Sequence, residues 1–459
     1  MKKLIISLSI IGLVGLTSCQ DDFMEYDPSS SVEVNGAIEN EGQLETAVLG
    51  IYDGLQSNFA YGNYYITAQE ILSDNGFVLF DNSNRFTDFY RYQHAISSGG
   101  SIANMWTIGY RVIARANFVL GFDGMIEGES VDQSFAEARA IRALELFNLV
   151  NYYARPYGTV NQDLGIPIPK NFESGTAIER SSVSDVYDEI TTQLELAAAN
   201  LPSATAGNKA RMTKEAAYGI LSRVYLYKKD YPKAIQFADL ALAGADLLGN
   251  TDLVNYYLNS MSSGETLFGI GFDALDNPGA NDALYATWSI GRYEDTAATS
   301  EFYNLISDTD IRKDLYQEWN TTDNPSPYGV LKFGGVDNDV VVIRATEVLL
   351  NKIEAMYFTN PAQASTLLVD WVQTNRDPAY TFSGSGQALL DEILLQRRIE
   401  LAFEGHRYFD MNRYQLDIQR GANSTVNSFM PFSDYRRVFP IPLNEMNTNP
   451  LMVQNPTYQ

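Results

Sequence analysis

Apolar residues recur about every 3.6 positions in several long stretches of the chain, which is the spacing of a helix with one buried face. In the first such stretch, Leu44, Val48, Ile51 and Leu55 fall on the same side. The pattern predicts amphipathic helices over residues 41–58, 102–120, 134–154 and 184–201. Prolines follow the last two ranges and fit their ends, because proline cannot continue a helix. The chain is therefore expected to be mainly α.

A pair of closely packed helices is indicated between residues 218 and 241. Small and aromatic residues occur there at the spacing of a tetratricopeptide repeat: Tyr218, Leu221, Ser222, Tyr225, Ala234, Ala238 and Ala241. Asp230-Tyr231-Pro232 fits the turn between the helices, and a looser copy of the pattern runs over 342–376. A helical hairpin that arose by chance is the alternative. The number of matched positions favours a true repeat.

Long stretches without a helical period separate these helices, at 60–100, 155–182, 245–340 and 414–459. Connections of this length are uncommon unless they carry a function or fold in their own way. Short apolar runs at 266–270 and 340–343 predict small strands. We therefore expect a helical-repeat frame that carries an irregular, loop-rich subdomain with few short strands.

The N-terminus predicts secretion and a lipid anchor. Residues 1–18 have two lysines followed by 13 mainly apolar residues, Leu4 to Leu16, whereas a membrane span needs about 20. Leu16-Thr17-Ser18-Cys19 resembles a bacterial lipobox, so Cys19 is expected to be lipidated and residues 19–36 to form a tether. An ordinary signal peptide with an incidental cysteine is the alternative. Because Cys19 is the only cysteine, no disulfide can form within the chain.

Charge and composition exclude several classes of function. With 57 acidic and 32 basic residues the net charge is −25, which disfavours nucleic acid as a partner. The chain has two histidines, His94 and His406, too few for a histidine-based metal site or a well-supplied Ser-His-Asp triad. No cofactor is expected. A structural calcium ion in an Asp- and Asn-rich loop stays open, although no EF-hand spacing is present.

Short motifs are spread along nearly the whole chain: Gly50-Ile51-Tyr52, Trp106 with Tyr110, Glu137-Ala138-Arg139, Phe147-Asn148-Leu149-Val150, Gly165-Ile166-Pro167, Val342-Ile343-Arg344, Arg397-Arg398-Ile399-Glu400-Leu401, Phe403-Glu404-Gly405-His406-Arg407, Pro440-Ile441-Pro442 and Asn455-Pro456-Thr457-Tyr458. Together, and in this order, they resemble the SusD/RagB family of Bacteroidetes surface lipoproteins. Gln396 departs from the family, which usually has Glu before the two arginines, and Met411-Asn412 replaces a more apolar pair. Both departures fall on an expected structural helix.

The resemblance implies one SusD-like domain over 37–459, built on about four tetratricopeptide-like helix pairs. The expected frame is mainly 37–60, 100–245 and 340–413, and the expected loop-rich binding face is mainly 60–100, 245–340 and 414–459. We interpret the charged residues between Arg397 and Arg413 as ion pairs of the frame, since their signs alternate at helical spacing. His406 is expected to be a packed or capping histidine and not a base.

The resemblance also implies a function. Family members bind oligosaccharides outside the cell, without catalysis, and deliver them to a SusC-like TonB-dependent transporter in the outer membrane, where the lipid anchor holds them. Neutral glycans suit the acidic chain better than sulfated or uronic polymers. A RagB-like peptide-binding protein is one alternative. A glycoside hydrolase is another, but it needs two carboxylates about 5–9 Å apart, and no motif singles out such a pair.

Sugar binding requires aromatic rings for the C–H faces of the sugar and polar side chains for its hydroxyls. Both kinds alternate in two loop-rich regions. The candidate ligand residues are Asp74, Asn75, Phe77, Phe80, Asn82, Asn84, Arg85 and Phe86 in the first region, and Trp288, Arg292, Tyr293, Trp319, Asn320 and Tyr328 in the second. The alternative for each aromatic residue is that it fills the core beneath the loops.

Overall fold

The computed structural model describes residues 36–172, 176–204, 209–250, 253–319, 327–421, 424 and 426–458. The expected signal peptide, Cys19, nearly all of the tether and Asn320 lie outside these residues. About half of the described chain is helical and its strands are few and short, which confirms the expected fold class. The helices are α2 (Glu41–Gln56), α3 (Tyr64–Leu72), α4 (Thr87–Tyr90), α5 (Ser101–Leu120), α6 (Val131–Tyr153), α7 (Val183–Asn200), α8 (Lys214–Tyr227), α9 (Tyr231–Leu242), α10 (Leu253–Leu258), α11 (Leu284–Trp288), α12 (Ser300–Tyr303), α13 (Ala345–Thr359), α14 (Pro361–Asn375), α15 (Gln387–Leu401), α16 (Arg407–Arg413) and α17 (Leu443–Thr448).

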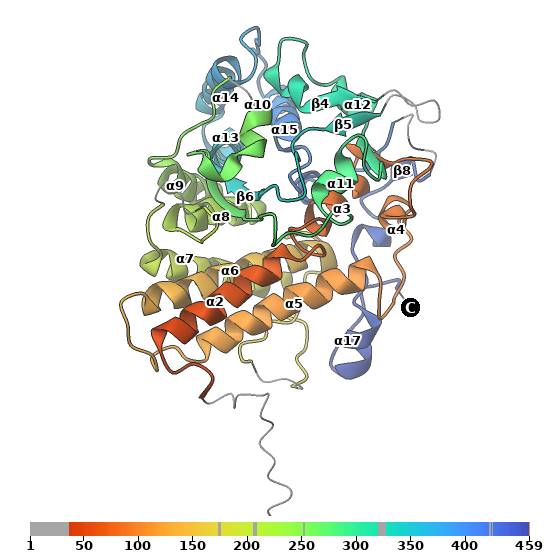
Figure 1. The fold of residues 1–459 in the computed structure, drawn as a ribbon. Helices are drawn as coiled ribbons and strands as arrows, with labels where there is room; N and C mark the ends of the chain where they lie inside the picture. The colour runs from red at the N-terminus through yellow and green to blue at the C-terminus, as the bar shows by residue number, and fades with distance from the viewer. Residues whose placement is uncertain are drawn as a thin grey trace, which may run out of the picture.

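Within the described residues the frame consists of four helix pairs, α2/α5, α6/α7, α8/α9 and α13/α14. Each pair packs on the next, through α5 against α6, α7 against α8 and α9 against α13. Figure 1 shows this stack running from α2 and α5 at its lower edge to α14 at its upper edge, with the strand-containing part beside it. The arrangement is the tetratricopeptide-like frame that the sequence predicts.

The α8/α9 pair shows why this segment forms a close helical hairpin. Asp230 is the N-cap of α9, where its Oδ1 accepts a hydrogen bond from the backbone N–H of Lys233 at 3.3 Å. Ala234, Ala238 and Ala241 lie fully buried on the inner face of α9. Because these side chains are small, the two helices approach closely enough for aromatic residues of both to stack.

The short strands form three antiparallel sheets in the described residues. One sheet has the order β1-β3-β5-β4, one pairs β2 with β6, and one pairs β7 with β8. The strands are β1 (Gly76–Val78), β2 (Thr266–Ile270), β3 (Thr296–Ala298), β4 (Tyr316–Glu318), β5 (Tyr328–Val330), β6 (Val340–Arg344), β7 (Ile418–Gln419) and β8 (Phe429–Met430). The two runs predicted as strands are β2 and β6, and they pair with each other.

Helix α3 lies in the 60–100 stretch, which has no amphipathic period. Every residue of α3 after Tyr64 is buried. The Tyr65 hydroxyl donates to Oε2 of Glu145 on α6 at 2.9 Å, and the opposite end of α3 leads into β1. This helix therefore connects the frame to the four-stranded sheet.

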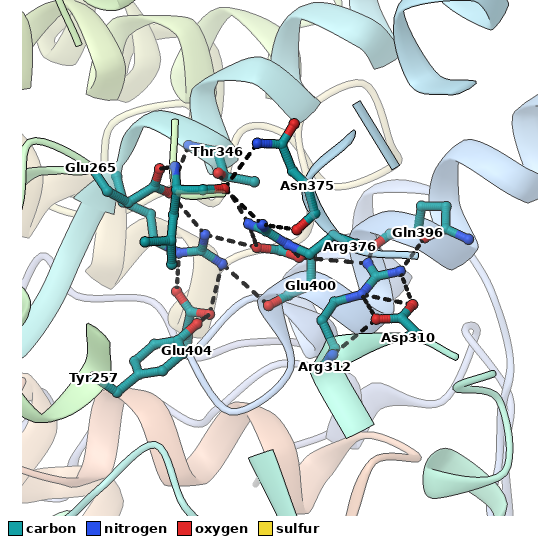
Figure 2. A network of polar contacts seen from close by, with 12 residues as sticks. Tyr257, Glu265, Asp310, Arg312, Thr346, Asn375, Arg376, Gln396, Glu400 and Glu404 are labelled. Atoms are coloured by element: carbon teal, nitrogen blue, oxygen red, sulfur yellow. Dashed lines mark hydrogen bonds and ion pairs between the residues drawn. The ribbon is translucent and has the colours of Figure 1, made fainter. Parts of the chain in front are cut away.

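A buried network of ion pairs joins α15 to the loop-rich part of the molecule (Figure 2). Glu400 accepts from Nε and Nη2 of Arg376, both at 2.7 Å, and from Nη1 of Arg344 at 2.9 Å. Arg344 also donates to Glu404, and Nζ of Lys332 lies 2.6 Å from Oε1 of Glu404. Carboxylates and cations are thus matched inside the protein, as burial requires.

The charged segment between Arg397 and Arg413 forms ion pairs, as interpreted from the sequence. Asp410 accepts from Nε of Arg397 and Nε of Arg413, each at 2.8 Å. His406 is buried beside Glu347, with its Nε2 3.6 Å from the carboxylate. Burial, together with the nearby arginines, lowers the pKa of His406 to about 4 despite Glu347. His406 is therefore a packed, neutral residue at pH 7.

In the described part of the chain, no helix combines the length and the apolar character needed to cross a membrane. The same residues contain no group of three or more His, Cys, Asp or Glu side chains placed to hold a metal ion.

Candidate ligand-binding surface

The four-stranded sheet brings together the two regions that the sequence singles out. Strands β1 and β3 are antiparallel, with Val78 opposite Thr296. The loop that leaves β1 and the loop that enters β3 therefore meet at one end of the sheet. Residues 80–86 and 281–293 form a surface region at this end of the sheet, which we call the Arg85–Tyr293 surface.

A buried carboxylate fixes the first loop to the second. Asp295 is fully buried, and its Oδ1 accepts from both the backbone N–H and the hydroxyl of Ser83 at 2.7 Å. The backbone N–H of Leu79 donates to the carbonyl of Asp295 at 2.9 Å. These three bonds hold the start of the 80–86 loop against the start of β3, so the loop has a defined position.

Arg85 crosses from one loop to the other. Its guanidinium lies 3.6 Å from Asp282 and 3.6 Å from Asp295, and it donates to the carbonyl of Asn281. The guanidinium carbon is also 5.4 Å from the centroid of the Tyr293 ring, which is the range of a cation–π contact. Arg85 therefore orders the polar edge of the surface and one face of Tyr293.

Two aromatic side chains are exposed on this surface. Phe80 is 51% exposed and Tyr293 is 44% exposed. The Tyr293 hydroxyl donates to Oδ1 of Asn281 at 2.6 Å, which fixes its ring. Nearby, the exposed Arg292 places its guanidinium carbon 4.8 Å from the centroid of Tyr285. Exposed, oriented rings beside amide and guanidinium groups are the arrangement that a sugar requires.

Four aromatic candidates face the interior instead. Phe77, Phe86, Trp288 and Trp319 are all at least nine-tenths buried. The Trp288 indole N–H donates to Oγ1 of Thr67 on α3 at 3.0 Å, and its ring packs against that of Phe403. No open ring face remains on these residues for a sugar. Their structural role is packing.

Asp74 and Asn75 connect the sheet to α15 and α16. Asp74 accepts from Nε and Nη2 of Arg407 at 2.8 and 2.9 Å, and Nη2 of Arg398 lies 3.3 Å away. Burial would raise the pKa of Asp74, but Arg398 and Arg407 outweigh it and hold that pKa below its ordinary value. Asn75 is fully buried and accepts from Nε of Arg398 at 2.8 Å. Both side chains are engaged within the protein.

Asn82 and Asn84 shape the 80–86 loop. The side chain of Asn82 donates to the carbonyl of Leu79 and accepts from the backbone N–H of Asn84 at 2.7 Å, forming a turn closed by a side chain. Asn84 has φ 64°, in the left-handed region that asparagine tolerates, and it is exposed. Asn84 can therefore offer its amide to a ligand.

Tyr328 lies at a separate part of the same sheet. It pairs with Ala298 across β3 and β5, and its ring stacks on that of Tyr303 with centroids 3.9 Å apart. Nζ of Lys313 lies 4.7 Å from the centroid of Tyr303. Tyr303 covers one face of Tyr328, which is half-buried.

Sequence reasoning missed four residues that build the Arg85–Tyr293 surface. They are Asn281, Asp282, Tyr285 and Asp295. All four belong to the long Gly-, Asp- and Asn-rich stretch that was assigned to the binding face only as a whole. No local sequence signal marks them, because their roles depend on contacts between the two loops.

Comparison with known proteins places the chain in a family. Residues 22–226 match a SusD-like family model described as starch-binding and associating with the outer membrane, and residues 327–458 match the SusD family model. The chain belongs to the SusD family. One SusD-family relative is SusD-like protein P2 of Formosa agariphila, which is 24% identical with complete coverage of both chains. A SusD-like protein of Bacteroides ovatus is also 24% identical, over 90% of this chain and 82% of its own length.

Solved structures of SusD-family members have this fold. A putative sugar binding protein from Bacteroides vulgatus superposes with a TM-score of 0.82 at 26% identity, and the match covers 92% of this chain and 100% of that one. A laminarin binding SusD-like protein superposes with a TM-score of 0.72 at 20% identity, again covering 92% and 100%. At that lower identity the likeness concerns the fold alone.

Proposed function

We propose that this SusD-family protein binds oligosaccharides at the cell surface without chemical change and delivers them to a TonB-dependent transporter. The observation that carries the proposal is the Arg85–Tyr293 surface, where the exposed ring of Tyr293 lies against the Arg85 guanidinium and the exposed Asn84 belongs to the same loop as Arg85. The starch-binding description of the matching family and the laminarin-binding relative with the same fold support a glycan as the ligand class.

Binding without catalysis suits the carboxylates of this surface. A glycoside hydrolase needs one carboxyl group to protonate the leaving oxygen while a second acts as nucleophile or base. Asp282 and Asp295, two carboxylates at this surface, both lie 3.6 Å from the Arg85 guanidinium. Their geometry is that of an ion-pair cluster that positions Arg85. A catalytic pair would instead face an open site across a bound sugar.

Calorimetric titration of residues 20–459, which retain every described residue, tests the ligand class. The panel contains laminari-, malto-, cello- and xylo-oligosaccharides and short peptides. In Tyr293→Ala, the loss of one stacking ring is expected to weaken binding by about 1 kcal/mol, or about five-fold. Phe172→Ala is the matched control, because Phe172 is also 44% exposed but packs against Phe118, away from this surface.

Saturable heat with a saccharide, weakened in Tyr293→Ala and unchanged in Phe172→Ala, supports the proposal. Heat with peptides alone would move the protein to the RagB-like alternative, and release of shortened sugars by the purified protein would identify an enzyme. Equal affinity of both variants for the saccharide would exclude the Arg85–Tyr293 surface as the binding site.

The place of the protein in the cell forms part of the same proposal. Lipidation of Cys19 would hold the domain on the outer membrane, at about 0.8 kcal/mol for each buried methylene of the acyl chains. Cys19→Ser is expected to release the protein from the membrane fraction. Co-purification of a TonB-dependent transporter with the tagged wild-type lipoprotein tests the partner, and its absence from the purified complex would contradict the delivery role.

A further inference from the structure

A cavity of about 350 Å³ lies where the segment after α6 meets the C-terminal segment. Its wall comes from residues between 155 and 164 and between 432 and 457, so it shares no residue with the Arg85–Tyr293 surface. Ligand pockets in proteins commonly have volumes of about 300–1,000 Å³. A cavity at the lower end of this range suits one or two sugar rings and not a long chain.

One side of the cavity offers apolar and aromatic surface. Tyr435 is 37% exposed there, with its ring held edge-on against Tyr458 at a centroid distance of 4.9 Å. Val160, in the segment after α6, also lines the cavity and is 76% exposed. Phe432 contributes a second ring, which has the Arg155 guanidinium carbon 5.6 Å from its centroid. These groups supply a face against which the C–H groups of a sugar can pack.

Asn455 gives the cavity a hydrogen-bond acceptor of fixed orientation. Its side chain is buried, and Nδ2 donates both of its protons, to the carbonyls of Tyr153 at 2.8 Å and Phe439 at 2.7 Å. The amide cannot be reversed, because its oxygen would then face two carbonyl oxygens. Among the described residues no donor reaches Oδ1 of Asn455. A ligand that fills the cavity is therefore favoured if it carries a hydroxyl or an N–H.

Arg155 holds the wall in place. Its Nη1 donates to the carbonyl of Phe432 at 2.9 Å, and its Nη2 donates to the carbonyl of Asp434 at 3.1 Å. Among the described residues that line the cavity, Arg155 alone is charged. The chain has a net charge of −25, but the described residues in the wall of this cavity include no carboxylate and one guanidinium. Such a wall suits the electronegative oxygens of a polyol.

We propose that this cavity binds a single saccharide unit, packed on Tyr435 with a ring hydroxyl donating to Oδ1 of Asn455, as a subsite separate from the Arg85–Tyr293 surface. The inference rests on the proposed function, since it assigns a second contact to the same class of ligand. It gives the protein two places at which a branched or long glycan can be held.

The test soaks crystals of residues 20–459 with laminaribiose, maltose, cellobiose and xylobiose, and titrates the same disaccharides by calorimetry. Val160→Trp fills the cavity from an exposed position. Met125→Trp is the matched control, because Met125 is 71% exposed and lies between α5 and α6. Tyr435→Ala is the second cavity variant, and Tyr293→Ala weakens the other surface. Tetra-alanine serves as the peptide probe.

We expect a sugar ring in the cavity of the wild type and Met125→Trp, and at least a five-fold loss of affinity at this subsite in both cavity variants. Tyr293→Ala should keep the sugar in the cavity. Saccharide binding that is lost in Tyr293→Ala but unchanged in Val160→Trp and Tyr435→Ala would overturn this inference and leave the proposed function standing. If no saccharide gives heat in the titration or density in the crystal, both this inference and the proposed function are overturned. Tetra-alanine in the cavity in place of sugars would overturn the saccharide assignment.

Discussion

Removing the charge of Glu400 tests how the loop-rich part is fastened to α15. In Glu400→Gln, Arg376 loses the carboxylate that accepts from its Nε and Nη2 at 2.7 Å, and Arg344 keeps Glu265 and Glu404. Arg376 and Arg344 are almost completely buried. The variant therefore leaves a buried guanidinium without a charged partner, which costs about 3–5 kcal/mol of the free energy of unfolding.

The magnitude translates into a measurable change of melting temperature. At about 2.1 cal/mol/K per residue, a chain of 459 residues unfolds with an entropy of about 1 kcal/mol/K. A loss of 3–5 kcal/mol then lowers the melting temperature by about 3–5 °C. Scanning calorimetry at pH 7 measures it. Asp391→Asn is the control, because it removes the same charge from an exposed position of the same helix and should shift the temperature by less than about 1 °C.

The pH dependence gives the same test a second readout. Burial alone would raise the pKa of Glu404, but Arg344 and Lys332 lower it to about 2. Arg376 and Arg344 lower the pKa of Glu400 in the same way. Carboxylates with a lowered folded-state pKa stabilise the fold above about pH 4.5 and lose this contribution as the pH falls further. The difference in melting temperature between wild type and Glu400→Gln should become smaller below pH 4. Equal melting temperatures of Glu400→Gln and Asp391→Asn at pH 7 would refute the reasoning.

Two further variants probe groups buried beneath the binding face. Trp288→Ala is expected to destabilise the fold by about 3–5 kcal/mol in urea denaturation, because it empties a fully buried site and removes the donor to Thr67; normal stability with lost saccharide binding would contradict its packing role. Burial raises the pKa of Glu70 to about 7 in the folded protein. Protonated Glu70 therefore stabilises the fold fully below about pH 4.5, and this stabilisation is lost as the pH rises through 7. Glu70→Gln should therefore be more stable than wild type by about 1–3 kcal/mol at pH 8 and equal to it near pH 4, and a constant difference across this range would contradict the assignment.

The helical frame was predictable because its packing follows a local rule. Helix α2 buries one face, so its apolar period is visible in the sequence, and the helix predicted over 41–58 spans Glu41–Gln56. Helix α3 escaped this rule, since burial on all sides removes the polar face that creates the period. The resemblance of motifs to a known family, and not periodicity, indicated how many helix pairs to expect.

The binding surface was predictable only as a pair of regions. Whether an aromatic residue faces a ligand or the core depends on strand pairing between distant segments. Phe77 lies opposite Ala297 in the sheet and is buried, whereas Phe80, three residues later, is past the last paired residue and is exposed. Composition cannot distinguish these two phenylalanines. The buried Asp295, which fixes the loop, is likewise recognisable only once Ser83 lies beside it.

The backbone around Arg85 is in an unusual conformation on both sides. Asn84 and Phe86 on either side both have positive φ values, 64° and 58°. Such a conformation is rare for phenylalanine, and strain of about 1–3 kcal/mol persists only where surrounding contacts enforce it. Here the Phe86 ring packs against Tyr64 with centroids 5.0 Å apart, and Asn82 closes the preceding turn. The fold thus accepts local strain to hold Arg85 between Asp282, Asp295 and the exposed ring of Tyr293.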